Sequence, residues 1–398
     1  MINVYVVAAF WFLAALLSTI IANRLKISMA LMEIIIGATI GFIAFKTGFS
    51  DKLALDADWM KLIAGLAAIM LTFLSGAELN PDSLKTKFKE ISIVGLVGFA
   101  APFIGATLIT HFLLHWELRP SLLAGIALST TSMAVVYAVM IEYGFNKTSL
   151  GKSILGACFV NDLGTVIGLG LIFAPFTYKT FIFLAVTVML IFVLPSITNY
   201  LIKHFAYKTA AIRTKWILFV LLSMGVLAMW SGSEPVLPAY IIGMVLARTI
   251  EKDNFFVRRL RTMTIGFLTP IYFLRAGALV SLPAILGAFF VFLLLFGGKI
   301  LFKIFGLYPV ISTFNKHRKE KWYYTLLMST GLTFGTISAL YGLTNNIINT
   351  EQYSIIVGVV IASAIIPTLI ANKFFLPDHL LEKPVLDDQL PDILNGKK

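Results

Sequence analysis

Two stretches of the chain, LSTTSMAVVYAV at 128–139 and MSTGLTFGTISAL at 328–340, interrupt long apolar segments with polar and small residues. The first places four hydroxyl side chains in a row. The second contains Ser329, Thr330, Gly331, Thr333 and Gly335. Hydroxyl groups compete for backbone carbonyls and glycine lowers helix propensity, so we expect each segment to be a helix that is broken near its centre.

The composition around these stretches is that of a membrane protein. Of 398 residues, 59% are hydrophobic and 13% are charged, which is about half the charged fraction of a soluble domain. Apolar segments long enough to cross a bilayer recur from end to end. The sequence predicts an all-α polytopic membrane protein with about thirteen transmembrane helices, at 2–22, 28–45, 59–79, 90–115, 121–142, 149–174, 179–202, 214–231, 235–248, 263–281, 283–308, 322–343 and 353–375.

The two broken segments belong to a longer internal repeat. LTFLSGAEL at 71–79 matches IYFLRAGAL at 271–279, at the same offset of 200 residues that separates 128 from 328. The first six segments then correspond to the last six, and the offset of seven segments inverts the second half in the membrane. Inverted repeats with facing broken helices are typical of secondary transporters. The alternative is that the small residues only allow close helix packing.

Charge in the predicted loops sets the orientation. Loops on one side of the thirteen segments carry 20 Lys and Arg and those on the other side carry 5, so the first side is predicted to be cytoplasmic. The N-terminus is then outside and the polar tail at 376–398 is inside. The net charge of +12 is explained by this asymmetry, and no nucleic-acid partner is implied. The single cysteine excludes an intrachain disulfide, and no Cys/His cluster suggests a metal site.

The stretch SILGACFVNDLGTVIGLGL at 153–171 places Asp162 near the centre of an apolar segment. Charged groups at membrane depth are rare and mark functional sites by default. A buried carboxylate takes up a proton readily, and its charged form ligates Na⁺, K⁺ or Li⁺, so proton and cation compete for one group. The alternative is permanent pairing with Lys or Arg. Asn161 is either a neutral ligand beside Asp162 or a packing residue.

Other ionisable groups also lie within the predicted segments, and Glu33, near the cytoplasmic end of its segment, is expected to be structural. Lys299 offsets charge near the broken helices or else extends toward the cytoplasm, whereas Lys303, one turn nearer that side, is expected to extend there. Arg275 and Glu78 hold near-equivalent places in the two repeats, and we favour a structural pair over a role in transport.

The sequence resembles the monovalent cation:proton antiporters, in the branch of the NapA-like and Kef-like exchangers. The resemblance rests on the order and spacing of LMEIIIGATIG, FLSGAELNP, ALSTTSMAVVYAV, FVNDLGTV, PIYFLRAGALV, GGKILFKIFG and STGLTFGTISALYG. It implies the NhaA/NapA-like fold in one membrane domain over 1–375 and a homodimer. A dimerisation part would cover about 1–80 and 211–281, a mobile core about 90–174 and 283–375, and a linker helix about 179–202.

The resemblance also implies roles for single residues. Asp162 would carry cation and proton in turn, and Thr130, Thr131 and Ser132 would add ligands. Lys299 would be the basic partner. Apart from the resemblance, Thr330, Arg275 and Glu78 are candidates for accessory residues. Asn161 replaces the aspartate of the electrogenic members, which indicates one-for-one exchange, yet the Arg and Glu that are usual in electroneutral members are missing.

We therefore predict Na⁺/H⁺ exchange by alternating access, in a multi-pass protein of a prokaryotic plasma membrane. K⁺/H⁺ exchange is the main alternative, and a sodium-coupled organic-anion symporter or a passive channel is less favoured. No cofactor is expected, and the partners are small cations, protons, membrane lipids and a second copy of the chain. An intramembrane enzyme is not expected, because the candidate site offers hydroxyls and one carboxylate but no histidine.

Overall fold

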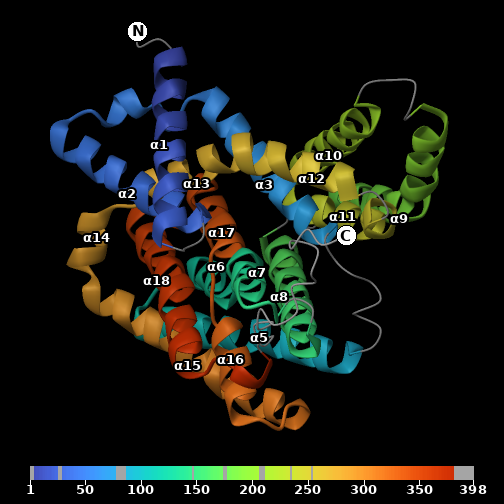
Figure 1. Ribbon diagram of the computed structural model, residues 1–398. Helices are drawn as coiled ribbons and strands as arrows, with labels where there is room; N and C mark the ends of the chain where they lie inside the picture. Colours follow the sequence, from blue (N-terminus) through green and yellow to red (C-terminus); the bar gives the residue numbers. More distant parts are fainter. Residues whose placement is uncertain are drawn as a thin grey trace, which may run out of the picture.

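A computed structural model gives the structure of the chain and describes residues 4–25, 29–77, 87–145, 148–173, 177–205, 211–233, 235–251 and 254–380. Within these ranges the regular structure is helical throughout, which confirms the predicted all-α class (Figure 1). The main helices are α1 (Val4–Leu25), α2 (Met29–Thr47), α3 (Asp58–Ala77), α5 (Phe88–Leu108), α6 (Leu118–Ser129), α7 (Met133–Glu142), α8 (Ser149–Phe173), α9 (Tyr178–Phe205), α10 (Ile212–Ser231), α11 (Val236–Glu251), α12 (Asn254–Met263), α13 (Thr269–Ala278), α14 (Leu282–Gly287), α15 (Phe289–Phe314), α16 (Arg318–Leu327), α17 (Thr333–Thr344) and α18 (Thr350–Phe374).

Short helical turns complete the described chain. Two π-helical turns, η2 (Ile109–Leu113) and η4 (Thr264–Leu268), continue α5 and precede α13. Two 3₁₀ turns, η1 (Ser50–Leu53) and η5 (Asp378–Leu380), follow α2 and α18. Each of the thirteen predicted segments therefore contains one helix or two consecutive ones.

The lengths of the helices support a membrane protein but not the number thirteen. Among the described residues, nine helices are long and apolar enough to cross a bilayer. Broken or short helices such as α6, α11 and α16 fall below that length. The multi-pass architecture is confirmed, whereas the count of thirteen spans stays a prediction.

The inverted repeat is visible in two equivalent helix crossings. Helix α2 packs against α13, and α11 packs against α3. Glycines make both crossings close: a Cβ added at Gly37 or Gly277 would collide with the backbone of the facing helix, and so would one at Gly76 or Gly243. Small residues at such crossings are the usual means of close helix approach in membranes.

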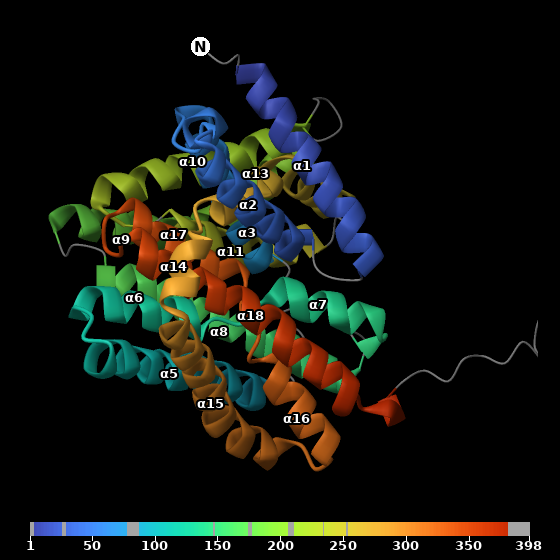
Figure 2. The ribbon, with the colours of Figure 1, turned by 90° about the vertical axis from the view of Figure 1, so that its left-hand side faces the viewer.

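The helices fall into two packed groups. One contains α1, α2, α3, α11 and α13, and the other contains α5, α6, α8, α15, α16, α17 and α18. Figures 1 and 2 place α1, α2 and α10 at one end of the molecule and α5, α15 and α16 at the other. The assignment of these groups as dimerisation and core parts stays a prediction.

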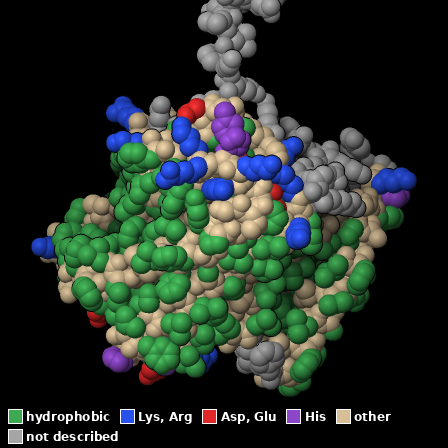
Figure 3. All heavy atoms as spheres, turned by 90° about the horizontal axis from the view of Figure 1, so that it is seen from below, with side chains coloured by type: hydrophobic (Ala, Val, Ile, Leu, Met, Phe, Trp, Pro, Cys, Tyr) green, Lys and Arg blue, Asp and Glu red, His purple; other side chains and the backbone are tan. Residues whose placement is uncertain are grey.

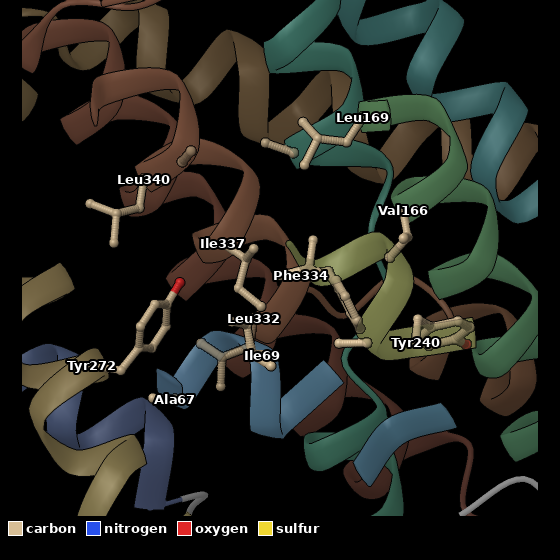
Figure 4. Packing of buried hydrophobic residues seen from close by; sticks show 14 of the residues in the cluster. Ala67, Ile69, Val166, Leu169, Tyr240, Tyr272, Leu332, Phe334, Ile337 and Leu340 are labelled. Atoms are coloured by element: carbon tan, nitrogen blue, oxygen red, sulfur yellow. The ribbon is translucent and has the colours of Figure 1, made fainter. Parts of the chain in front are cut away.

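A hydrophobic core joins the two groups. Figure 4 shows Phe334 and Ile337 of α17 between Ile69 of α3 and Val166 of α8, with Leu340 farther along α17 on the side of Tyr272. The outside is equally apolar, because large side chains along α1 and α9 are exposed. The face seen in Figure 3 is mostly hydrophobic, and its basic side chains gather toward one edge. A surface of this kind suits contact with lipid.

Candidate functional site at the crossing of two broken helices

Both predicted helix breaks are present. Helix α6 ends at Ser129 and α7 begins at Met133; Thr130 between them is extended, with φ −62° and ψ 152°. Helix α16 ends at Leu327 and α17 begins at Thr333. The hydroxyl-rich and glycine-rich stretches therefore interrupt their helices where the sequence predicts it.

The two breaks touch each other. The Thr131 hydroxyl donates to the carbonyl of Met328 over 2.8 Å, and the Ser132 N–H meets the hydroxyl of Thr330 at 3.4 Å. All four residues have essentially no solvent-accessible surface. Buried backbone groups of each half therefore hydrogen-bond to hydroxyl groups of the other half across the crossing, and not to solvent.

Hydroxyl groups at the breaks also cap their own helices. The Thr130 hydroxyl donates to the carbonyl of Ala127 over 3.0 Å, and that of Thr330 donates to Leu327 over 2.7 Å. A hydroxyl that donates one hydrogen bond keeps acceptor lone pairs. Thr130 and Thr330 therefore retain oxygen atoms that are able to ligate a cation.

Asn161 holds the first break in place. Its Oδ1 accepts from the N–H of Thr131 over 3.0 Å, and its Nδ2 donates to the carbonyl of Ser129 over 3.4 Å. The amide thereby pairs one donor and one acceptor that the break removes from helical bonding. The structure gives Asn161 a hydrogen-bonding role in the break.

Asp162 follows on the same helix and is fully buried. Neither of its carboxylate oxygens has a hydrogen-bond partner in the described part of the chain. One turn earlier, the thiol of Cys158 lies 3.6 Å from the sulfur of Met328, which places this stretch of α8 against the second break. An unpaired buried carboxylate is costly, so this position favours a bound proton or a bound cation.

Two lysines of α15 enter the same region. Lys303 and Lys299 are both completely buried. The Lys303 ammonium donates to the Thr131 hydroxyl over 3.1 Å. The Lys299 ammonium donates to the Ser363 hydroxyl of α18 over 2.9 Å, and a Cβ added at Gly331 would collide with it.

The expectation that Lys303 extends toward the cytoplasm was wrong. The end of a half-helix carries partial negative charge, and Thr131 links the Lys303 ammonium to the carbonyl of Met328 at the end of α16. The Thr131 hydroxyl accepts the hydrogen bond that water would accept if the Lys303 side chain extended to the membrane surface. Ser363 was not predicted as part of the site either, although it lies 201 residues after Asp162, close to the repeat offset of 200.

Arg275 lies outside this cluster. Its Nε donates to the carbonyl of Leu55 over 2.7 Å, and its guanidinium lies 3.8 Å from the carboxylate of Asp56. Glu78, its predicted partner, lies outside the described residues. The structure therefore brings together Thr130, Thr131, Ser132, Asn161, Asp162, Lys299 and Thr330 at the crossing, but not Arg275.

Known proteins resemble this chain in sequence and in fold. The model of the family "Sodium/hydrogen exchanger, transmembrane" matches residues 12–374. A probable Na⁺/H⁺ antiporter 3 of Methanocaldococcus jannaschii is 30% identical over 55% of this chain and 58% of its own length. A Na⁺/H⁺ antiporter of Enterococcus hirae is 24% identical over 89% of this chain and 93% of its own.

The curated relatives differ in the length they share with this chain. The alignment covers 58% of the Methanocaldococcus protein and 46% of the putative Na⁺/H⁺ antiporter YjbQ of Bacillus subtilis. The solved structure of the sodium proton antiporter MjNhaP1 of M. jannaschii matches 93% of this chain and 99% of its own, with a TM-score of 0.69 at 18% identity. That likeness shows the fold, and the match of the family model over most of the chain shows that this protein belongs to the sodium/hydrogen exchanger family of membrane transporters.

Proposed function

We propose that the protein exchanges a monovalent cation, most readily Na⁺, for protons across the membrane. Asp162 binds the cation and the proton in turn, because a single carboxylate at the crossing excludes one while it holds the other. Thr130, Thr131 and Ser132 offer further oxygen ligands from the first break. Alternating access of this site to the two sides completes the exchange.

The observation that carries this proposal is the state of the Asp162 carboxylate. It is fully buried, and both of its oxygens lack hydrogen-bond partners in the described residues, while the backbone around it is satisfied. A purely structural carboxylate at this depth would be paired. A carboxylate whose partner is a transported ion has free ligand positions of this kind.

Asn161 supports a one-for-one exchange. Its amide is hydrogen-bonded to the first break on both sides. Because an amide does not titrate, α8 offers one titratable carboxylate at the crossing and not two. One cation for one proton moves no net charge, and the membrane potential, worth about 2.3 kcal/mol per charge at 100 mV, would then not drive transport.

We propose a homodimer in a prokaryotic plasma membrane, with the N-terminus outside and the C-terminus in the cytoplasm.

Exchange in proteoliposomes tests the proposal. A preset pH gradient should collapse when Na⁺ is added to the wild-type protein, and the rate should not change when the membrane potential is clamped. Asp162→Asn should abolish the response. A wild-type rate in Asp162→Asn would refute the role of Asp162, and a rate that follows the clamped potential would refute the one-for-one stoichiometry.

The same vesicles distinguish the alternative cations. Thr130, Thr131 and Asp162 offer hydroxyl and carboxylate oxygens, which suit K⁺ and Li⁺ as well as Na⁺. A larger response to K⁺ than to Na⁺ would favour K⁺/H⁺ exchange by the same site. An organic-anion symporter would leave the pH gradient unchanged on addition of any of these salts.

A further inference from the structure

Two histidines and a glutamate meet at one edge of the molecule, away from the helix crossing. His317 precedes α16, Glu320 lies in its first turn, and His379 lies in η5 beyond the end of α18. One ligand atom from each of the three side chains lies within 4.8 Å of the other two. Sequence spacing did not predict this cluster, because His379 follows Glu320 by 59 residues.

The contacts within the cluster are direct. Nε2 of His379 lies 2.7 Å from the carboxylate of Glu320, and the rings of His317 and His379 have their centroids 4.9 Å apart. All three residues reach solvent at least in part. A small ion therefore has access to the three ligand atoms from the aqueous side.

Further contacts hold η5 against α16 beside the cluster. Lys319 hydrogen-bonds to Asp378, and that contact lowers the pKa of the Asp378 carboxyl from its ordinary value. Trp322 of α16 stacks on Phe375 at 5.5 Å. These neighbours on both sides fix the segments that carry His379 and Glu320, so the ligand atoms are brought together before any ion binds.

Two imidazoles and one carboxylate form a typical donor set for Zn²⁺ and related divalent transition metals, with water in the fourth position. Bond lengths of about 2.0–2.2 Å put two tetrahedral ligand atoms about 3.4 Å apart. The His379 nitrogen and the Glu320 oxygen, now 2.7 Å apart, would therefore separate slightly, and side-chain rotation would adjust all three ligand atoms around the ion. Figure 3 shows the face whose basic side chains gather at one edge. Beside the cluster, the charge of Lys319 in α16 is offset by Asp378 in η5.

We propose that His317, Glu320 and His379 bind a divalent transition-metal ion of the Zn²⁺ class, which fastens η5 to the first turn of α16. This site is separate from Asp162 and takes a resident ion, not a transported one. Helix α16 runs directly into the break at Met328. A bound ion at its first turn therefore restrains one half of the broken helix and sets how readily that half moves.

Co²⁺ is the probe for this site, because its visible absorption reports nitrogen and oxygen ligation. The experiment uses the full chain in detergent without a polyhistidine tag. We expect saturable binding of one Co²⁺ per chain, displaced by Zn²⁺, and a loss of affinity of at least about tenfold in His379→Ala and in Glu320→Gln. His204→Ala is the matched control, since His204 is an exposed histidine of α9 whose Nδ1 meets the carbonyl of Tyr200 in the same helix.

The outcomes separate this proposal from the proposed exchange. Asp162→Asn should keep full Co²⁺ binding while it loses exchange. The proposal is overturned if the wild-type protein gives no saturable Co²⁺ signal, or if His379→Ala and Glu320→Gln bind as the wild type does. Should His379→Ala fail to fold, Glu320→Gln carries the test, because it changes one oxygen of a surface side chain.

Discussion

The two halves of the molecule repeat one backbone but divide the charge between them. Helix α5 begins at 88 and α15 at 289, while α8 begins at 149 and α18 at 350, so both pairs are offset by 201 residues. At this offset Asp162 on α8 corresponds to Ser363 on α18, and Gly98 on α5 corresponds to Lys299 on α15. The first half supplies the carboxylate of the crossing, and the second half supplies its ammonium groups.

This division has an electrostatic reason. Two buried carboxylates at equivalent places would repel each other and need two cations, whereas one carboxylate near buried ammonium groups lowers the cost of burial for both signs. Close packing enforces the difference at Gly98, where an added Cβ would come within 3.3 Å of Nδ2 of Asn161. The repeat therefore preserves both helix breaks, whereas the charged residues at the crossing differ between the two halves.

Moving the carboxylate to its equivalent place gives the largest expected effect. Asp162→Asn combined with Ser363→Asp keeps the number of charges but puts the carboxylate at the Lys299 ammonium, where the Ser363 hydroxyl now lies at 2.9 Å. The new carboxylate would be paired with Lys299 and unable to release a proton or bind a cation. We expect no detectable Na⁺-driven collapse of a pH gradient in proteoliposomes.

Ser363→Asp alone is the control for folding and for the second charge. Size-exclusion chromatography should show it as well folded as the wild type, because it adds a carboxylate beside a buried cation. Restored exchange in the double variant would contradict the comparison, since the two places would then be equivalent in function as well as in backbone.

Sequence patterns predicted much of the fold but only part of the candidate site. The hydroxyl row at Ser129–Ser132 and the glycines after Thr330 predicted both breaks, because backbone propensity is a local property. Asp162 was found because a carboxylate in an apolar run is costly wherever it points. The burial of Lys303 was not predicted, because it depends on a hydrogen bond to the Thr131 hydroxyl, and Thr131 lies 172 positions earlier in the sequence. No local pattern encodes such a contact.

The two lysines allow a second test of the division of charge. The Lys303 ammonium bonds to Thr131, whose N–H bonds to Asn161 beside Asp162, whereas Lys299 bonds to Ser363. We expect Lys303→Met to slow exchange by at least about tenfold, which corresponds to about 1.4 kcal/mol, and Lys299→Met to slow it less. Initial rates of gradient collapse at saturating Na⁺ measure both. The opposite order would give Lys299 the larger role in exchange, in line with the basic role that the family resemblance implies for it.

Asn161 gives a third difference between the halves, since the residue at its equivalent place in α18 is Ala362. Asn161→Ala removes the acceptor for the N–H of Thr131 and the donor to the carbonyl of Ser129. Leaving such buried groups unpaired costs about 1–3 kcal/mol each. We expect a lower thermal unfolding temperature in detergent, measured by fluorescence.

Ala362→Ser is the matched control in the second half, where no asparagine supports the break. Its unfolding temperature should stay close to that of the wild type. An unchanged temperature in Asn161→Ala would show that the first break needs no support from α8.

The smallest expected effect separates the two threonines at the breaks. The Thr130 hydroxyl bonds only within its own turn in the described chain, to Ala127, whereas that of Thr330 also meets the N–H of Ser132 across the crossing. Thr330→Val should therefore lower the free energy of unfolding by about 1 kcal/mol more than Thr130→Val, the worth of one neutral hydrogen bond. Unfolding in detergent measures this difference, and the valine keeps the volume and β-branching of threonine. Equal losses would mean that the 3.4 Å contact between Ser132 and Thr330 contributes nothing, and that the Thr131–Met328 bond joins the two breaks without it.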